Sequence, residues 1–314
     1  MKPHAILIAG ATASGKSALA MRLATELPGV LINADSMQLY AELRVLTARP
    51  TPADEARVPH RLYGIWPVSE PGSAGRWLGL AKAEIEAALA AGRTPIVIGG
   101  TGLYFAALTE GLAPIPTVPA AVRAAAGRRL AALGNEAFHA ELAARDPEMA
   151  QRLRPSDTQR LQRAFEVVEA TGRSLADWQR AEPAEAGLEM PWRGYVLELP
   201  RARLYRRIEA RLEAMMAAGA LDEVRRLAAL GLDPGLPAMK ALAMPELLRH
   251  LAGEIPLEAA LLAAKQATRR YAKRQLTWQR NKMHAWNRIL AQDSECFYGI
   301  IFPEISQFLL TLED

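Results

Sequence analysis

The chain has 314 residues, of which 50% are hydrophobic and 23% are charged, and its formal net charge is +4 at pH 7. This length can bury one elaborated core or two smaller ones, and no apolar run reaches the roughly 18 residues of a membrane span, so we expect a cytoplasmic protein without a membrane partner. One cysteine excludes an internal disulfide, and five scattered histidines lack the spacing of zinc ligands.

The first predicted strand, residues 5–9, runs directly into a glycine-rich loop. Residues 10–17 read GATASGKS, which fits the pattern G-x-x-x-x-G-K-[ST], and a helical segment follows. In this context backbone N–H groups converge on an anion, Lys16 reaches terminal phosphate oxygens and Ser17 ligates Mg²⁺. We therefore predict a diphosphate or triphosphate site with Mg²⁺ as cofactor, formed by Gly10, Ala11, Thr12, Ala13, Ser14, Gly15, Lys16 and Ser17.

Two more apolar runs, residues 30–34 and 95–98, are predicted strands on either side of an amphipathic helix at 78–91. Strands that alternate with helices indicate an α/β fold with a parallel sheet between helices, whose ligand site lies at the carboxyl ends of the strands. Asp35 follows the first of these runs and Thr101 follows the second. We expect both to meet the phosphate loop in one crevice.

The residue types at these two positions leave their roles open. Asp35 could bind Mg²⁺, accept a proton from an attacking nucleophile, or only cap a helix. Thr101 could donate to a phosphate or bridging oxygen, or be a turn residue among glycines. The chain also lacks an apolar strand that ends in the Asp of the second ATPase motif, which argues against a motor ATPase.

The middle of the chain has a different pattern. A proline-rich segment at 113–119 precedes residues 120–180, which read as helical with breaks at Gly134 and Gly172. A strand at 195–199 and one long helix at 203–230 return the chain to the sheet, and the remainder reads as helical. We predict a P-loop NTPase-like core over residues 1–115 and 190–314, with an inserted all-helical subdomain at 116–189.

The C-terminal part carries an uneven charge. Residues 259–292 contain eight Lys or Arg and no Asp or Glu, with aromatic residues among them. On a helix Arg270, Lys273 and Arg274 share one face, which could track a nucleic-acid backbone. A solvated basic helix whose tryptophans pack in the core fits the same pattern.

From the residues, two enzyme classes remain open. One is a small-molecule kinase, which transfers a terminal phosphoryl group, and the other is an enzyme that uses a diphosphate as leaving group. A third hypothesis is an RNA-binding protein with a vestigial nucleotide site.

Over residues 5–290 the chain resembles the tRNA dimethylallyltransferases, also called tRNA isopentenyltransferases. The segments that carry this resemblance are residues 10–17, 35–40, 47–50, 58–60, 99–104, 157–164 and 268–278. The sequence departs from the family pattern at Met37 and Leu46, where Arg and Gly are usual, and at 240–245. The resemblance implies transfer of a dimethylallyl group from dimethylallyl diphosphate to N6 of the adenine just 3′ of the anticodon in tRNA.

The resemblance also implies roles for individual residues. Asp35 is the expected general base, and Lys16 and Arg211 are expected to neutralise the leaving diphosphate. Thr101 is expected at the diphosphate bridge or catalytic centre. The tRNA contacts implied are Asp35, Ser36, Met37, Gln38, Arg123, Gln159, Arg160, Leu161, Gln162, Arg163, Arg270, Lys273 and Arg274. We expect a monomer, and a related prenyltransferase that modifies free AMP is the alternative within this chemistry.

Overall fold

The computed structural model describes residues 2–183, 185–290 and 294–311. The chain divides into two compact units, an α/β unit formed by Met1–Thr109 and Leu188–Asp314, and a helical unit formed by Glu110–Gly187.

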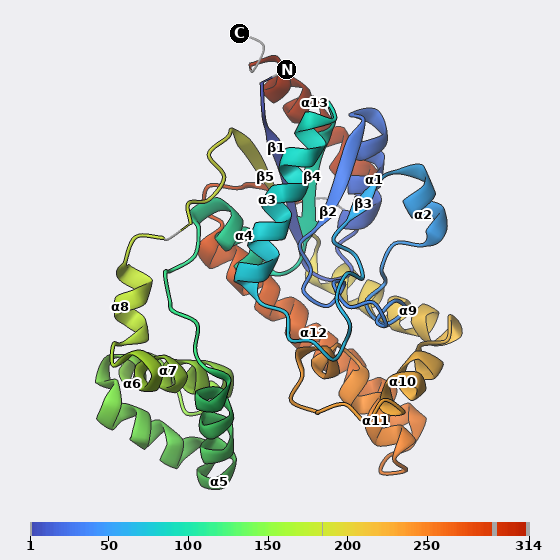
Figure 1. The fold of residues 1–314 in the computed structure, drawn as a ribbon. Helices are drawn as coiled ribbons and strands as arrows, with labels where there is room; N and C mark the ends of the chain where they lie inside the picture. The colour runs from blue at the N-terminus through green and yellow to red at the C-terminus, as the bar shows by residue number, and fades with distance from the viewer. Residues whose placement is uncertain (1, 184, 291–293, 312–314) are drawn as a thin grey trace. The chain divides into compact units, whose positions relative to one another are not determined.

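The α/β unit contains one six-stranded sheet with the order β3-β2-β4-β1-β5-β6 (Figure 1). All neighbouring strands are parallel. The strands are β1 (Ala5–Gly10), β2 (Gly29–Asn33), β3 (His60–Arg61), β4 (Thr94–Gly99), β5 (Trp192–Glu198) and β6 (Asn287–Leu290). Because β1, β2 and β4 are buried along their whole length, their sequences are continuous apolar runs. The predicted parallel α/β fold is confirmed.

The α/β unit also contains helical segments. They are α1 (Lys16–Glu26), α2 (Pro52–Arg57), α3 (Ala74–Ala90), α4 (Gly102–Glu110), α9 (Arg201–Ala217), α10 (Ala220–Ala228), the 3-10 helix η1 (Pro237–Lys240), α11 (Met244–Leu251), α12 (Leu257–Lys282) and α13 (Ser294–Leu310). Ile6 and Ile8 of β1 share a buried cluster with Leu19 of α1 and Phe297 of α13. In the described part of the chain, no helix is both long enough and apolar enough to cross a membrane.

The C-terminal half differs from the sequence prediction in two places. The single helix expected at 203–230 is wrong, because Gly219 has a φ of 91° and separates α9 from α10. This left-handed conformation suits glycine, which has no Cβ to clash with the following carbonyl. The expectation that only helices follow is also wrong, because the short edge strand β6 pairs with β5.

The helical unit contains α5 (Ala120–Arg145), α6 (Pro147–Arg152), α7 (Thr158–Thr171) and α8 (Leu175–Arg180). Its core includes Phe138 and Phe165, whose ring centroids lie 4.8 Å apart. Both predicted glycine breaks are confirmed, since Gly134 has a φ of 71° within α5 and Gly172 ends α7 with a φ of 64°.

Substitutions of Gly219 and Gly79 test whether stability depends on the backbone conformation of the glycine that is replaced. Gly219→Ala should lower the free energy of unfolding by about 1–2 kcal/mol, because the new Cβ would occupy a left-handed conformation. Gly79→Ala should raise it by about 0.5–1 kcal/mol, because Gly79 lies within α3, is exposed, and has open space at its Cβ position. Urea denaturation of both variants measures the difference, and changes of the same sign would contradict the explanation.

Candidate active site

The phosphate loop joins β1 to the N-terminus of α1. The Ser14 N–H donates to the Ala11 carbonyl over 3.1 Å, and Gly15 precedes α1 with a φ of 96°. The loop therefore turns back on itself and presents the free N–H groups and positive dipole end of α1. This is an anion-binding conformation.

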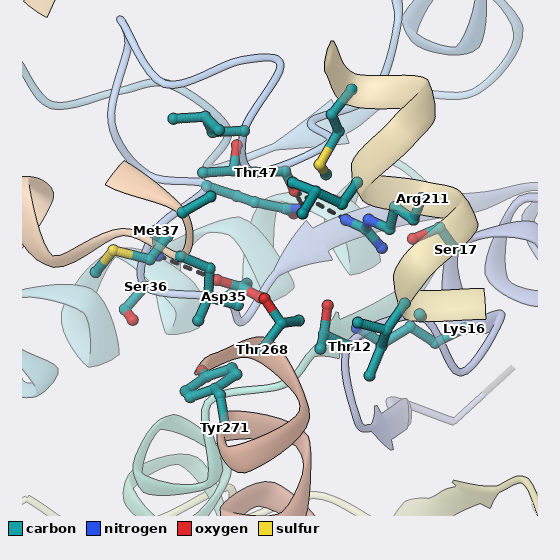
Figure 2. Close-up of a pocket in the computed structure, with 18 of the residues that line it drawn as sticks. Thr12, Lys16, Ser17, Asp35, Ser36, Met37, Thr47, Arg211, Thr268 and Tyr271 are labelled. Carbon is teal, nitrogen blue, oxygen red and sulfur yellow. Dashed lines mark hydrogen bonds between the residues drawn. The ribbon is translucent and has the colours of Figure 1, made fainter. Parts of the chain in front are cut away.

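A cavity lies over this loop, and segments far apart in the sequence line it (Figure 2). Thr12, Lys16 and Ser17 come from the phosphate loop and the start of α1. The other residues that matter for its chemistry are Asp35, Ser36, Met37, Gln38, Thr47, Arg211, Thr268, Tyr271 and Arg274. The predicted phosphate loop and Asp35 thus meet in one cavity.

A buried asparagine orients Asp35. Asn33 donates through Nδ2 to the carbonyls of Asp35 and Leu62, both at 3.0 Å, and its Oδ1 accepts from the Asp35 N–H at 2.8 Å. The Asp35 Oδ1 accepts from the Met37 N–H at 3.0 Å. These bonds make a tight turn after β2 that places a carboxylate at the cavity wall, where it can take a proton or contribute to a metal site.

Thr101 acts on the same turn from the neighbouring strand. Its hydroxyl accepts from the Ser36 N–H at 3.0 Å and lies 3.4 Å from the Ser36 hydroxyl. Thr101 therefore lies next to the Asp35 turn, whereas the cavity wall itself is formed by Asp35 and Ser36.

Cationic side chains surround the phosphate loop. The pKa of Lys16 is lowered to about 8, mainly because the side chain is buried; the Asp35 carboxylate opposes this shift and nearby Arg211 adds to it. Burial also lowers the pKa of Arg211, again opposed by Asp35. Arg207, one helical turn before Arg211, lies so close that a Cβ built on Gly15 would be 3.2 Å from its guanidinium. Cationic side chains thus outnumber the one carboxylate, Asp35, among the residues lining the cavity, which favours an anion.

The side-chain amide of Gln275 in α12 bridges two loops of the site. Its Oε1 accepts from the Thr12 N–H at 2.9 Å, and its Nε2 donates to the Gly100 carbonyl at 2.8 Å. Gln275 is 6% exposed. The sequence patterns assigned no role to Gln275 or to Arg207, although Gln275 lies within the segment 268–278 that carries the family resemblance.

The predicted basic face exists on α12. Arg270, Lys273 and Arg274 are exposed, and the Arg274 guanidinium lies over the Tyr271 ring, 5.6 Å from its centroid. Trp286 is buried against Phe105. Trp286 thus packs in the core, while the basic face of α12 is exposed and available to a partner.

The remaining residues expected to contact RNA belong to the helical unit. Arg123, Gln159 and Arg160 are exposed there. Gln162 donates to Glu166 at 3.0 Å, and Arg163 forms an ion pair with the same Glu166. Leu161 is buried in the core of this unit, so its side chain does not belong to the exposed face.

Two oxygen donors of the cavity suit Mg²⁺. The Ser17 hydroxyl and the Asp35 carboxylate line the same cavity beside the phosphate loop. Mg²⁺ prefers hard oxygen ligands and is often held by one or two protein groups together with substrate phosphates. Among the residues that the structure describes, no three His, Cys, Asp or Glu side chains form a metal cluster.

Two family models match this chain. The model described as IPP transferase matches residues 38–282, and the model described as Isopentenyl transferase matches residues 3–65. The chain is 62% identical over 283 residues to a tRNA dimethylallyltransferase of Rhodospirillum centenum, covering 90% of both chains. It is 55% identical over 307 residues to that of Paramagnetospirillum magneticum, covering 98% of this chain and 97% of the relative.

Solved structures show the same likeness. A full-length tRNA isopentenylpyrophosphate transferase from Bacillus halodurans is similar over 100% of both chains, with a TM-score of 0.70 and 29% identity. A eukaryotic dimethylallyltransferase, described as acting on tRNA, has a TM-score of 0.77 and 25% identity over 92% of this chain and 74% of its own.

The lowered pKa of Lys16 has a measurable consequence for anion binding. Above pH 8 the ligand-free Lys16 loses its proton, so binding of inorganic diphosphate must restore the charge and weakens as pH rises. We expect the diphosphate Kd of Lys16→Met, divided by the diphosphate Kd of the wild type, to fall about tenfold per pH unit above pH 8 until this ratio approaches one. Calorimetry at several pH values measures it, and ionisation of the ligand cancels in the ratio. A constant ratio between pH 7 and 10 would contradict the shift.

Proposed function

The chain belongs to the IPP transferase family, and from this premise we propose that it transfers a dimethylallyl group from dimethylallyl diphosphate to N6 of an adenine in tRNA. We infer the adenine just 3′ of the anticodon as the target. The observation that carries the proposal is that Asp35, Lys16 and Arg211 line one cavity with the phosphate loop.

The phosphate loop binds the leaving group in this proposal. As the carbon–oxygen bond breaks, negative charge develops on the diphosphate. Loop N–H groups, Lys16 and Arg211 are positioned to stabilise that charge, and preorganised cations of this kind act more strongly in the transition state than in the ground state. Arg207 lies beside Gly15 and contributes to the same stabilisation.

Asp35 is the proposed general base. The N6 lone pair forms a bond to C1 of the allyl group, the electrons of the breaking bond leave with the diphosphate, and the N6 proton passes to the Asp35 carboxylate. An adenine amine is a weak nucleophile, so orientation next to C1 and late removal of the proton are what the protein supplies. The hydrogen bonds between Asn33 and the Asp35 backbone, one donated and one accepted by the Asn33 side chain, hold the turn that carries this carboxylate.

Mg²⁺ is the proposed cofactor, with Ser17 as its protein ligand and Asp35 nearby. When bound, it would supply further positive charge to the diphosphate oxygens. Lys16 and Arg211, which line the same cavity, would hold the diphosphate together with it.

The tRNA partner fits the charge distribution. The exposed face of Arg270, Lys273 and Arg274 is suited to the phosphates of the anticodon stem. Ser36, Met37 and Gln38 lie at the cavity, where a base flipped from the loop would enter. We propose further that the helical unit, with Arg123 and the segment 159–163, contacts the same RNA and that the enzyme acts as a cytoplasmic monomer.

A direct assay tests the reaction. Incubation with labelled dimethylallyl diphosphate, Mg²⁺ and unmodified tRNA should move the label to RNA, and AMP should be a much poorer acceptor. ATP hydrolysis or phosphoryl transfer without prenyl diphosphate would favour the kinase alternative. Preference for AMP over tRNA would favour the AMP-directed prenyltransferase.

Asp35→Asn tests the general base. The asparagine keeps an oxygen for the Met37 N–H but cannot accept the proton from N6, so kcat should fall by about 10²–10⁴-fold. Single-turnover transfer measures this effect, and a filter-binding assay should show unchanged tRNA affinity. Near-normal turnover would remove Asp35 from this role.

Arg207→Ala tests the α9 arginine beside Gly15, with the adjacent Arg206 as control. Loss of the guanidinium beside Gly15 should weaken inorganic diphosphate binding by about tenfold. Arg206→Ala is the matched control, because Arg206 is exposed on the same helix turn, and it should leave the Kd unchanged. Equal effects of the two substitutions would contradict a specific role for Arg207.

A further inference from the structure

A buried carboxylate holds the loop that follows the Asp35 motif. Glu223 lies on α10 and is 2% exposed. Its Oε2 accepts from the N–H groups of Arg44 at 2.9 Å and Val45 at 2.8 Å, and its Oε1 accepts from the Leu46 N–H at 3.0 Å. Hydrogen bonds to an ionised carboxylate are roughly twice as strong as neutral ones, so three in succession fix this backbone firmly.

The next residue along this loop serves the active site. The Thr47 carbonyl accepts from the Gln38 side chain at 2.8 Å and from the Arg211 guanidinium at 3.2 Å. Leu46 and Thr47 also line the cavity. The residues at 44–46 are therefore fixed by Glu223, and their neighbour Thr47 orients one side chain of the Asp35 motif and one cation of the phosphate site.

We infer that Glu223 is a positioning residue for the leaving-group side of the site, acting on Arg211 through the loop 44–47. This inference rests on the proposed function for its catalytic meaning. Glu223 touches no reacting atom in this arrangement. Its carboxylate sets where the Thr47 carbonyl lies, and that carbonyl sets where the Arg211 guanidinium points.

Position 223 requires a carboxylate, and a side chain of the same shape with an N–H donor would not replace it. A glutamine would place an NH₂ group where one carboxylate oxygen now accepts, so a donor would face at least one backbone N–H. Leaving a buried donor unpaired is costly, and the loop would shift to reach water or another acceptor. Glu223→Gln therefore removes the function with little change in volume.

The matched control lies next to it in the sequence. Asp222 is exposed and pairs with Arg225 at 2.5 Å on the same helix. Asp222→Asn removes a carboxylate from α10 without touching the loop 44–47. Inorganic diphosphate binding should weaken by about tenfold in Glu223→Gln and remain unchanged in Asp222→Asn. Prenyl transfer, as kcat/KM for dimethylallyl diphosphate, should fall by about 10²-fold only in Glu223→Gln.

A double-mutant cycle separates positioning from loss of stability. In an Arg211→Ala background, Glu223→Gln should change the diphosphate Kd by less than about twofold, because the guanidinium that it positions is gone. Thermal melts identify variants that do not fold, and Kd is measured on folded protein. Independent effects of the two substitutions on Kd, or a wild-type Kd in Glu223→Gln, would overturn the inference.

The double-mutant cycle tests the positioning role of Glu223, and the transfer assay tests the proposed function independently of it. Coupling between Glu223 and Arg211 in diphosphate Kd supports the positioning role even if no prenyl group reaches tRNA. Absence of transfer by the wild-type protein would instead sink the proposed function.

Discussion

The junction of the phosphate loop, the β4–α4 loop and α12 depends on the Gln275 side-chain amide. It accepts from the phosphate loop at Thr12 and donates to the β4–α4 loop at Gly100, while its own helix carries the basic face. An amide is needed because one end must accept and the other must donate; a Glu could not donate, and a Leu would leave two buried backbone groups unpaired. The phosphate loop, the Thr101 segment and α12 are therefore held in a fixed arrangement, which the proposed chemistry and the proposed RNA contact share.

Charge imposes the second constraint. Lys16, Arg207 and Arg211 crowd the loop, with Asp35 as the carboxylate that opposes their repulsion. The lowered pKa values of Lys16 and Arg211 show that burial works against their charged forms. The diphosphate of the proposed reaction would relieve this conflict by supplying the missing negative charge. The ligand thus completes an electrostatic arrangement that the protein alone leaves unbalanced.

Much of this site could be predicted from the sequence, because its parts follow strands. The phosphate loop and Asp35 come directly after apolar runs, and parallel strands bring their carboxyl ends to one edge. The edge strands β3 and β6 are too short to carry a pattern. The sequence does not distinguish a glycine tolerated within a helix from one that separates two helices, and only the φ of Gly219 shows that it separates α9 from α10. Gln275 and Glu223 act through contacts 263 and 177 or more positions away, and such pairings arise only from the packed fold.

The cation cluster around the phosphate loop also shapes what happens after the bond has broken. In the proposed reaction, inorganic diphosphate carries more charge than the esterified substrate, and the same Lys16, Arg211 and loop N–H groups would hold it. A site that stabilises the diphosphate as it leaves carbon therefore also binds the free diphosphate afterwards. For the proposed reaction, we therefore expect the departure of diphosphate to limit turnover.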